Sequence, residues 1–405
     1  AGSSPWICMS ESNRTLLMCV AVAAAFAINM MGTTLPTPLY PIWQERLGFS
    51  QLTITVIFAA YAVGVIAALV IGGSWSDQLG RRPMLFAGLG FSAASACIFL
   101  IGDDLGLLLL GRVLSGVSAG IFTGTATAAV VELAPPAWAG AATLVATAAN
   151  MGGLGLGPLV AGALAEYLPW PAHLCFVLDL VLIALAAFAV WCAPERVQRP
   201  ARPRLRLQPL RVPASVRPVF VPAATAGFAG FAVLGLFTAV APAFMGEVLG
   251  HHNRALTGAV VFLLFVASTV GQAGQSRLPE SRRLPLGCGL LMAGIALVAA
   301  AILAASLALM IAGALIAGVG QGVAFRAGLG AVTAASPAER RGEVASTFFV
   351  VAYVAISIPV VGVGLAADVF GLPAAGVTFS IGVALLALAA LVSLSRRARA
   401  AGPAV

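Results

Sequence analysis

Apolar stretches long enough to cross a lipid bilayer recur along the whole chain, and short polar or proline-containing segments separate them. A transmembrane helix needs roughly 20 mostly apolar residues. Glycine and proline within such stretches are compatible with membrane helices, because neighbouring helices satisfy the backbone groups that these residues free. The pattern predicts twelve membrane spans, at residues 15–39, 53–73, 84–102, 107–133, 140–165, 172–193, 218–243, 255–274, 285–303, 307–333, 343–366 and 374–395.

Composition supports an all-α membrane protein. Hydrophobic residues make up 60% of the 405 residues and charged residues only 9%, and the mean hydropathy is +1.03. Soluble domains carry about 25% charged residues. Water does not tolerate the apolar surface that such a chain would expose, so lipid is the expected solvent.

The arginines predict the orientation of the chain in the membrane. All 22 basic residues are arginine; 18 fall in the tails and loops of one side, and only Arg46 and Arg254 fall on the other. Positive loops stay in the cytoplasm, so we expect a multi-pass protein of the bacterial inner (plasma) membrane with both termini cytoplasmic. The net charge of +8 then reflects topology, and no nucleic-acid-binding face accompanies it.

Several function classes lack support in the sequence. The six cysteines form no close pair and have no accompanying set of histidine ligands, so we expect no metal, no cofactor and no disulfide framework. No nucleophile–base set is present, which argues against an enzyme. No ATP-binding motif occurs either, so a transport process would draw on an ion gradient. Residues 1–8, before Met9, resemble a tag remnant.

The chain repeats itself after 202 residues. Gly116, Gly120 and Glu166 coincide with Gly318, Gly322 and Asp368. Six spans separate the copies, so both have the same orientation in the membrane. We therefore expect a tail (1–14), a six-helix bundle (15–193), a cytoplasmic linker with seven arginines and five prolines (194–217), a second six-helix bundle (218–395) and a final tail (396–405).

A polar motif lies between spans 2 and 3, and here the chain resembles the major facilitator superfamily. The motif of that family, G-x-x-x-D-x-x-G-R-[RK], is matched by Gly73, Asp77, Gly80, Arg81 and Arg82. Parallel repeats of six helices are also the plan of these transporters. The resemblance covers the whole chain and implies two pseudo-symmetric bundles.

The resemblance implies a conformational latch made by these five residues. Asp77 would meet the start of span 11, near 342–346, in the outward-facing state, where a helix N-terminus favours negative charge. Arg81 would pair with Glu132 at the inner end of span 4. The alternative is that Arg81 and Arg82 serve positive-inside topology alone.

Two charged residues inside spans are candidates for proton coupling. Arg112 precedes a run of glycines in span 4 and resembles the arginine motif of drug–proton antiporters in the family; the alternative is that it reaches the membrane surface. Asp179 in span 6 is the one acid well inside a span, where it can carry a proton or serve as a structural partner. Span 1 lacks the acid that many of these antiporters carry there.

Span 5 resembles the antiporter motif of the family's exporters, through Gly153, Gly157, Pro158 and Gly162. Glycine and proline predict a kinked, closely packed helix. Leu144 stands where the motif has a further glycine.

The resemblance also implies a central cavity lined by spans 1, 4, 7 and 10. Arg326, which has no counterpart in the first half, would attract an anionic or strongly polar group there; the alternatives are a structural pair or a side chain directed to the cytoplasm. Aromatic and polar side chains suit amphiphilic ligands. The candidate substrate-binding residues are Asn29, Tyr61, Phe122, Phe231, Phe237, Gln321, Arg326 and Tyr353.

These features predict a secondary active transporter that works by alternating access and exports small amphiphilic compounds or drugs in exchange for protons. Its expected partners are the lipid bilayer, a small-molecule substrate and protons, and we expect a monomer. An uptake or exchange carrier for a small organic anion, with Arg112 and Arg326 as counter-charges, remains an alternative. A non-transporting membrane receptor is a further one.

Overall fold

The computed structural model describes residues 11–73, 75–102, 104–197, 200 and 206–400. These residues contain helices and no strand, and twelve of the helical segments are long and apolar enough to cross a membrane. The predicted all-α fold is confirmed. Residues 1–8 and the end of the predicted final tail (401–405) lie outside the described residues.

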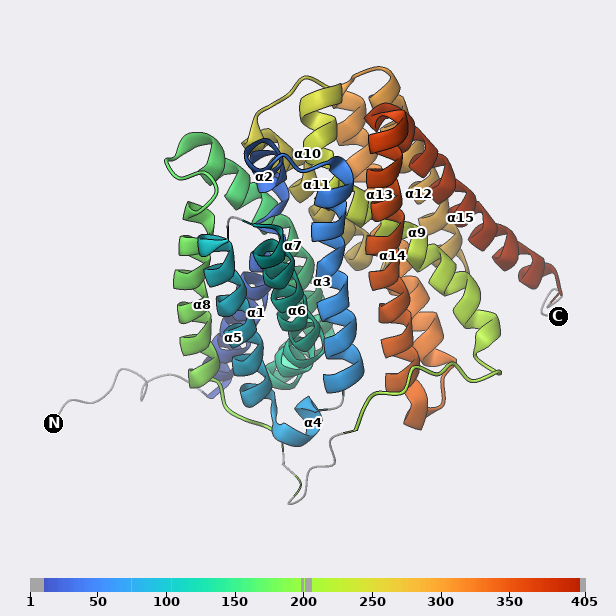
Figure 1. Cartoon of the computed structure of the whole chain (residues 1–405). Coiled ribbons are helices and arrows are strands. Elements are labelled where there is room, and N and C mark those ends of the chain that lie inside the picture. The colour runs from blue at the N-terminus through green and yellow to red at the C-terminus, as the bar shows by residue number, and fades with distance from the viewer. Residues whose placement is uncertain (1–10, 74, 103, 198–199, 201–205, 401–405) are drawn as a thin grey trace.

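The long helices form two groups of six (Figure 1). Those of the first half are α1 (Glu11–Thr34), α3 (Gln51–Gly72), α5 (Arg81–Ile101), α6 (Leu105–Leu133), α7 (Ala139–Tyr167) and α8 (Leu174–Cys192). Those of the second half are α9 (Arg217–Ala239), α11 (Arg254–Gly274), α12 (Glu280–Leu303), α13 (Leu307–Ala334), α14 (Arg341–Phe370) and α15 (Leu372–Ala400). Short elements connect them: η2 (Thr37–Leu39), α2 (Tyr40–Leu47), α4 (Ser76–Leu79), η3 (Pro136–Trp138), α10 (Ala241–Ala243), η4 (Phe244–Val248), η5 (Gln275–Arg277) and η6 (Ala338–Arg340).

Two boundaries differ from the sequence prediction. The first span does not stop at residue 39: after the prolines, η2 and α2 carry the chain on to Leu47. Hydropathy missed α2 because it contains polar and charged residues. At the other end of the chain, α15 continues through Ala400, so residues 396–400 are helical rather than a tail.

Polar residues fix the starts of four long helices at one end of the molecule. Ser50, Asp104, Asn253 and Ser306 each accept a hydrogen bond from the backbone N–H three residues further on, at the start of α3, α6, α11 and α13. Such caps satisfy the free N–H groups of a helix terminus. Asp104 and Ser306 are 202 residues apart, so the repeat extends to helix capping.

Within each half, the glycines of the repeat permit close helix packing. A side chain at Gly116 in α6 would collide with the backbone of Tyr61 in α3, and one at Gly318 in α13 would collide with the backbone of Leu264 in α11. Small residues at such contacts are typical of membrane helices. The same pair of helices is thus joined in the same way in both halves.

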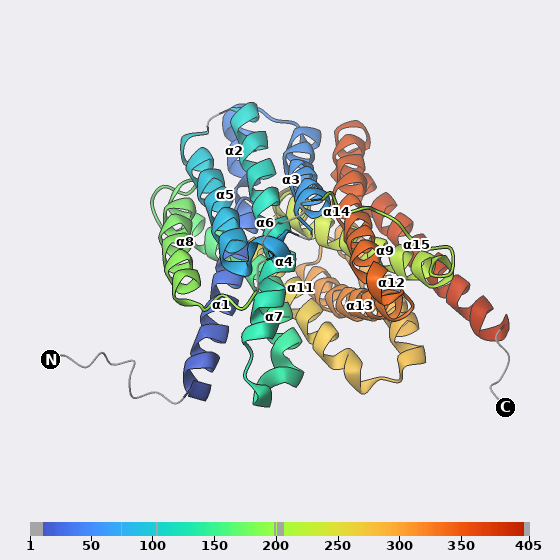
Figure 2. The same ribbon diagram turned by 90° about the horizontal axis from the view of Figure 1, so that it is seen from below.

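The halves meet along two helix pairs, α7 with α11 and α3 with α14. Figures 1 and 2 show these helices side by side along the seam. We call the end with α4, the linker, η5 and η6 the arginine-rich end, and the opposite end, with α2 and α10, the arginine-poor end. The described parts of the linker between α8 and α9 lie at the arginine-rich end, residues 193–197 beneath the first half and 206–216 along the second (Figure 1).

Candidate functional site

A cavity of about 880 Å³ lies between the two halves. Its walls come from α1, α3, α6 and α7 of the first half and from α9, α11, α12, α13 and α14 of the second. Exposed residues of the arginine-rich end, Glu280, Ala334 and Arg341, line its mouth. The cavity therefore opens at that end, and its size is within the range of roughly 300–1,000 Å³ that small-molecule sites occupy.

Arg112 lies at the deep end of this cavity. Its side chain is only 2% exposed, and Nη1 donates a hydrogen bond to the backbone oxygen of Thr33 at 2.6 Å. The guanidinium lies over the rings of Tyr61 and Phe58, 4.8 and 5.5 Å from their centroids. Its Nε has no hydrogen-bond partner. The sequence alternative that Arg112 reaches the membrane surface is wrong, because α6 begins at Leu105 and places this side chain two turns inside the bundle.

Tyr61 and Tyr353 bridge the halves beside Arg112. Their ring centroids are 6.2 Å apart. On the side of the second half, Phe231 continues the aromatic wall, 6.2 Å from Tyr353. Four of the eight predicted binding residues, Tyr61, Phe231, Arg326 and Tyr353, line the cavity.

Arg326 extends from α13 into the wider part of the cavity. Its Nη1 approaches Oγ1 of Thr147 in α7, at 3.4 Å, across the gap between the halves. Among the described residues no carboxylate forms an ion pair with it. The repeat-related position in α6 is Gly124, where an added side chain would meet nothing within 4 Å. The site is thus asymmetric, with a cation on one wall and open space on the other.

The other four predicted binding residues do not line the cavity in this structure. Asn29 is fully buried between α1 and α6, where its Oδ1 accepts a hydrogen bond from Ser118. Gln321 is fully buried and accepts a hydrogen bond from Ser268. Phe122 packs against Phe26, and Phe237 is part of the core of the second half. These side chains lie on the sides of their helices that contact neighbours within one half.

Asp179 lies away from the cavity, between α8 and α1. It is 2% exposed, its Oδ1 has no hydrogen-bond partner, and its carboxyl group lies where a side chain at Gly32 would be. Gly32 directly precedes Thr33, the residue whose backbone holds Arg112. One segment of α1 therefore contacts both charged residues that the sequence proposed for coupling.

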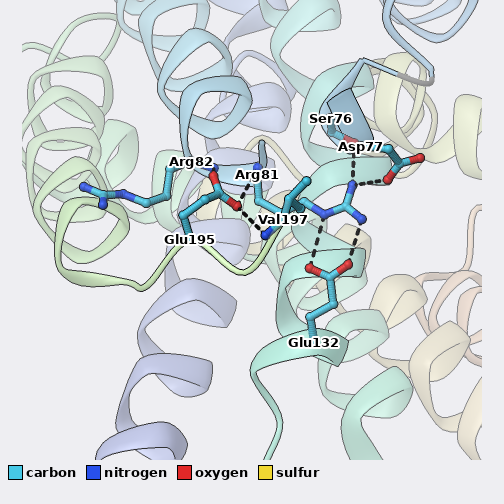
Figure 3. A network of polar contacts seen from close by, with 7 residues as sticks. All are labelled: Ser76, Asp77, Arg81, Arg82, Glu132, Glu195 and Val197. Carbon is cyan, nitrogen blue, oxygen red and sulfur yellow. Dashed lines mark hydrogen bonds and ion pairs between the residues drawn. The ribbon is translucent and has the colours of Figure 1, made fainter. Parts of the chain in front are cut away.

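The predicted pair of Arg81 and Glu132 is present at the arginine-rich end (Figure 3). Arg81 binds both carboxylate oxygens of Glu132, at 2.7 and 3.3 Å. The other side of the guanidinium contacts Asp77 and Ser76, each at 2.7 Å. Such bidentate geometry is among the stronger forms of ion pairing. The side chain of Asp77 is 67% exposed and is bound within its own half, not to the start of α14.

The linker joins this network and also separates the halves. Glu195 accepts hydrogen bonds from the backbone N–H groups of Arg81 and Arg82, at 3.1 and 3.0 Å, at the start of α5 (Figure 3). Further along, the N–H of Gln208 donates to the oxygen of Val70 at 2.7 Å. The side chain of Gln208 lies against Gly73 in the first half and Gly342 in the second. The linker thus occupies the space between α3 and the start of α14.

The antiporter-motif glycines of α7 pack against two different helices. Side chains at Gly153 and Gly157 would collide with the backbone of α1, and one at Gly162 would collide with the backbone of Arg254 at the start of α11. The oxygen of Pro158 faces Gly258 of α11. The motif therefore joins α7 to its own half and to the other half at once.

Two repeat-related contacts close the arginine-poor end. Glu166 in α7 accepts a hydrogen bond from the N–H of Arg254, at 3.0 Å, at the start of α11. Asp368 in α14 accepts hydrogen bonds from the N–H groups of Gln51 and Leu52, at 3.0 and 3.2 Å, at the start of α3. Both carboxylates lie where a helix N-terminus favours negative charge. We call these two contacts the end clasps.

Each clasp residue follows a seam glycine by one helical turn. Gly162 precedes Glu166 and packs on α11, and Gly364 precedes Asp368 and packs on α3. Glu166 and Asp368 coincide in the sequence repeat, and the structure places both at the N-terminus of a helix of the other half. A repeated glycine–carboxylate pair at the end of a span is the signal that reveals them.

Two six-helix halves around a central cavity open at one end are the architecture of a membrane transporter with a parallel repeat. The chain belongs to the Major Facilitator Superfamily, whose family model matches residues 22–280. It is therefore a transporter, and the family contains transporters rather than enzymes.

The fold resembles solved transporters along almost the whole chain. A bacterial homologue of the human lysosomal transporter Spinster, in an inward-facing and occupied conformation, matches with a TM-score of 0.70 at 18% identity and covers 98% of both chains. The human organic anion transporter MFSD10 (TETRAN) matches with a TM-score of 0.67 at 18% identity and covers 95% of this chain and 100% of that one.

A curated relative by sequence is the putative multidrug resistance protein MdtD of Salmonella typhi, which is 28% identical over 171 residues. The match spans 42% of this chain and 36% of the relative's length, less than two thirds of that protein.

Proposed function

We propose that this transporter exports small amphiphilic compounds by alternating access, in exchange for protons. The observation that carries the proposal is a cavity between two repeat-related halves, open at one end and closed at the other by repeat-related contacts. Such halves can rock about a central site and open it to each side in turn.

The arginine distribution supports a cytoplasmic position for the arginine-rich end and both termini. In that orientation the structure is inward-facing, with the cavity open to the cytoplasm. Rocking to the outward-facing state would break the end clasps and bring Asp77 to the start of α14. The end clasps and the Asp77 latch would then alternate, each stabilising one state.

Asp179 is the proposed proton carrier. An isolated charge in an apolar interior is costly, and this carboxyl group has no ion-pair partner among the described residues. Helix α1 contacts both Asp179 at Gly32 and Arg112 at Thr33, so a proton bound on one side of α1 can influence the cavity on its other side. The absence of an acid in span 1 is therefore compatible with proton exchange.

The glycine–proline motif of α7 and the similarity to a putative multidrug resistance protein support export over uptake. Transport in inverted membrane vesicles tests both direction and coupling. Three fluorescent probes with one aromatic body are suitable: 1-pyrenesulfonate, 1-pyrenemethanol and 1-pyrenemethylammonium. Acidifying the vesicle lumen should drive accumulation of at least one probe. Accumulation only when the gradient is reversed would favour uptake, and no movement of any probe would overturn the proposed function.

The variant Asp77→Asn tests the latch. It should leave the inward-facing state intact and destabilise the outward-facing one, because a neutral side chain interacts less with a helix N-terminus, by about 0.3–1 kcal/mol. Labelling of single cysteines introduced in the cavity should shift toward the cytoplasmic side. The control Glu339→Gln, an exposed acid in η6 at the same end, should not shift it. Equal labelling of the Asp77 variant and the parent would refute the latch.

A further inference from the structure

The charges that line the cavity are unequal in sign. Arg112, Arg283, Arg326 and Arg341 line it, against a single carboxylate, Glu280. Glu280, Arg283 and Arg341 lie in the first turns of α12 and α14, at the mouth, where water screens them. Deeper inside, only Arg112 and Arg326 carry charge among the described residues of the lining. An arginine cannot be deprotonated in a protein, so the inner cavity is permanently cationic.

Among the described residues, no carboxylate pairs with either deep arginine. Arg326 makes a long hydrogen bond to the hydroxyl group of Thr147. Arg112 is almost fully buried, yet its Nε has no partner, and it contacts a backbone oxygen and two rings rather than a carboxylate. A buried cation without a counter-ion is costly. An incoming anion would relieve that cost.

The cavity also has room and apolar surface for more than an anionic group. At the repeat-related position of Arg326, the first half lines the cavity with Gly124, where an added side chain would meet nothing within 4 Å. Phe231, Phe325 and Phe349 line the cavity on the side of the second half, and their rings pack against one another through Phe325, with centroids 5.1 and 5.8 Å apart. The cavity volume of about 880 Å³ is large enough for one small molecule.

We propose that the transported compound is an amphiphilic anion: a carboxylate, sulfonate or phosphate attached to an apolar body. Arg326 binds the anionic group, and the aromatic wall holds the apolar body. Arg112 supplies a second positive charge at the closed end of the cavity. This inference rests on the proposed function and names the substrate class of the same site.

Binding to purified protein in phosphatidylcholine nanodiscs tests the inference without any variant. The three pyrene probes share one body and differ in charge, and empty nanodiscs correct for partition into lipid. Because hydrogen bonds to a charged group contribute about 1.5–3 kcal/mol, 1-pyrenesulfonate should bind roughly 10-fold or more tighter than 1-pyrenemethylammonium. Equal or weaker binding of the sulfonate would overturn the inference.

Variants then locate the anion site. Arg326→Gln should remove most of the preference for the sulfonate, and Arg326→Lys should retain part of it. A matched control is provided by Arg282, an exposed residue that does not line the cavity, beside Arg283, which does; Arg282→Gln should leave binding unchanged. An unchanged preference in Arg326→Gln would refute the assignment to Arg326.

Competition identifies the source of the anion. Displacement of 1-pyrenesulfonate by oleoyl lysophosphatidic acid but not by naphthalene-2-sulfonate would indicate a lipid anion, and the reverse result would indicate a water-soluble one. The inference and the proposed function fail separately. If only the neutral or cationic probe is transported along a proton gradient, the proposed export function stands and the anionic substrate class is wrong. If the sulfonate binds tightly but no probe is transported, the anion-binding site stands and the proposed export function is wrong.

Discussion

Replacement of Asp179 by asparagine is expected to abolish accumulation driven by a proton gradient while substrate exchange without a gradient persists. Asparagine matches the size of a protonated aspartate but neither binds nor releases a proton in its place. The carboxyl group lies in contact with α1, and no charged side chain of the described residues forms an ion pair with it. Coupling free energies of 1–3 kcal/mol predict a loss of roughly 5- to 150-fold in the effect of the gradient.

Reconstituted liposomes separate the two activities. Uptake of the transported pyrene probe after a pH jump measures coupling, and counterflow of the same probe at equal pH measures the cavity and the rocking motion. The control Glu339→Gln removes an exposed acid and should preserve both. Retention of gradient-driven uptake in Asp179→Asn would show that the proton travels elsewhere. Loss of both activities in a folded variant would show that Asp179 has a structural role and does not couple transport to protons.

Neutralising both end clasps, with Glu166→Gln and Asp368→Asn, is expected to shift the molecule toward the outward-facing state. A carboxylate at a helix N-terminus contributes about 0.3–1 kcal/mol when exposed and up to about 2 kcal/mol when partly buried. The two clasps act on the same closed end, so the double variant should change the ratio of states by roughly 3- to 100-fold. Each single variant should produce about half of that change in free energy.

Distances between spin labels placed at the arginine-poor ends of α7 and α11 measure the shift. The control Asp104→Asn alters a carboxylate at the same end that caps only its own helix, α6, and should leave these distances unchanged. An unchanged distribution in the double variant would show that glycine packing alone holds that end closed. In that case Gly162 and Gly364, not the carboxylates, determine the state.

The sequence predicted the number of spans and the fold because both depend on length and hydropathy, which the bilayer constrains strongly. The repeat also singled out Gly116 and Gly318, which the structure places in contact with α3 and α11 respectively. Lipid-facing and protein-facing sides of these helices are both apolar, however, so hydropathy does not show which side of a helix faces inward. For this reason the sequence proposed Asn29 in α1, whereas the structure places Thr33 and Thr34 of that helix in the cavity.

The charged residues were easier to predict than their partners. Arg112 and Arg326 were recognisable because charge inside a span is costly, and both line the cavity. The partner of Arg81 followed from the family pattern and is present. The end clasps were missed because helix N-termini offer backbone N–H groups, which leave no trace in the side-chain sequence.

The linker has a mechanical consequence for the transport cycle. Gln208 is bound to Val70 at the end of α3 and lies against Gly342 at the start of α14, and these two helices must approach each other for Asp77 to reach α14. In the proposed transport cycle, this linker segment acts as a spacer that keeps α3 and α14 apart at the arginine-rich end. Closing that end would break the hydrogen bond of Gln208 and opening it would re-form it, at a cost of about 0.5–1.5 kcal/mol for the hydrogen bond alone. We therefore expect the length and sequence of the linker around Gln208 to influence how long the cavity stays open to substrate at this end.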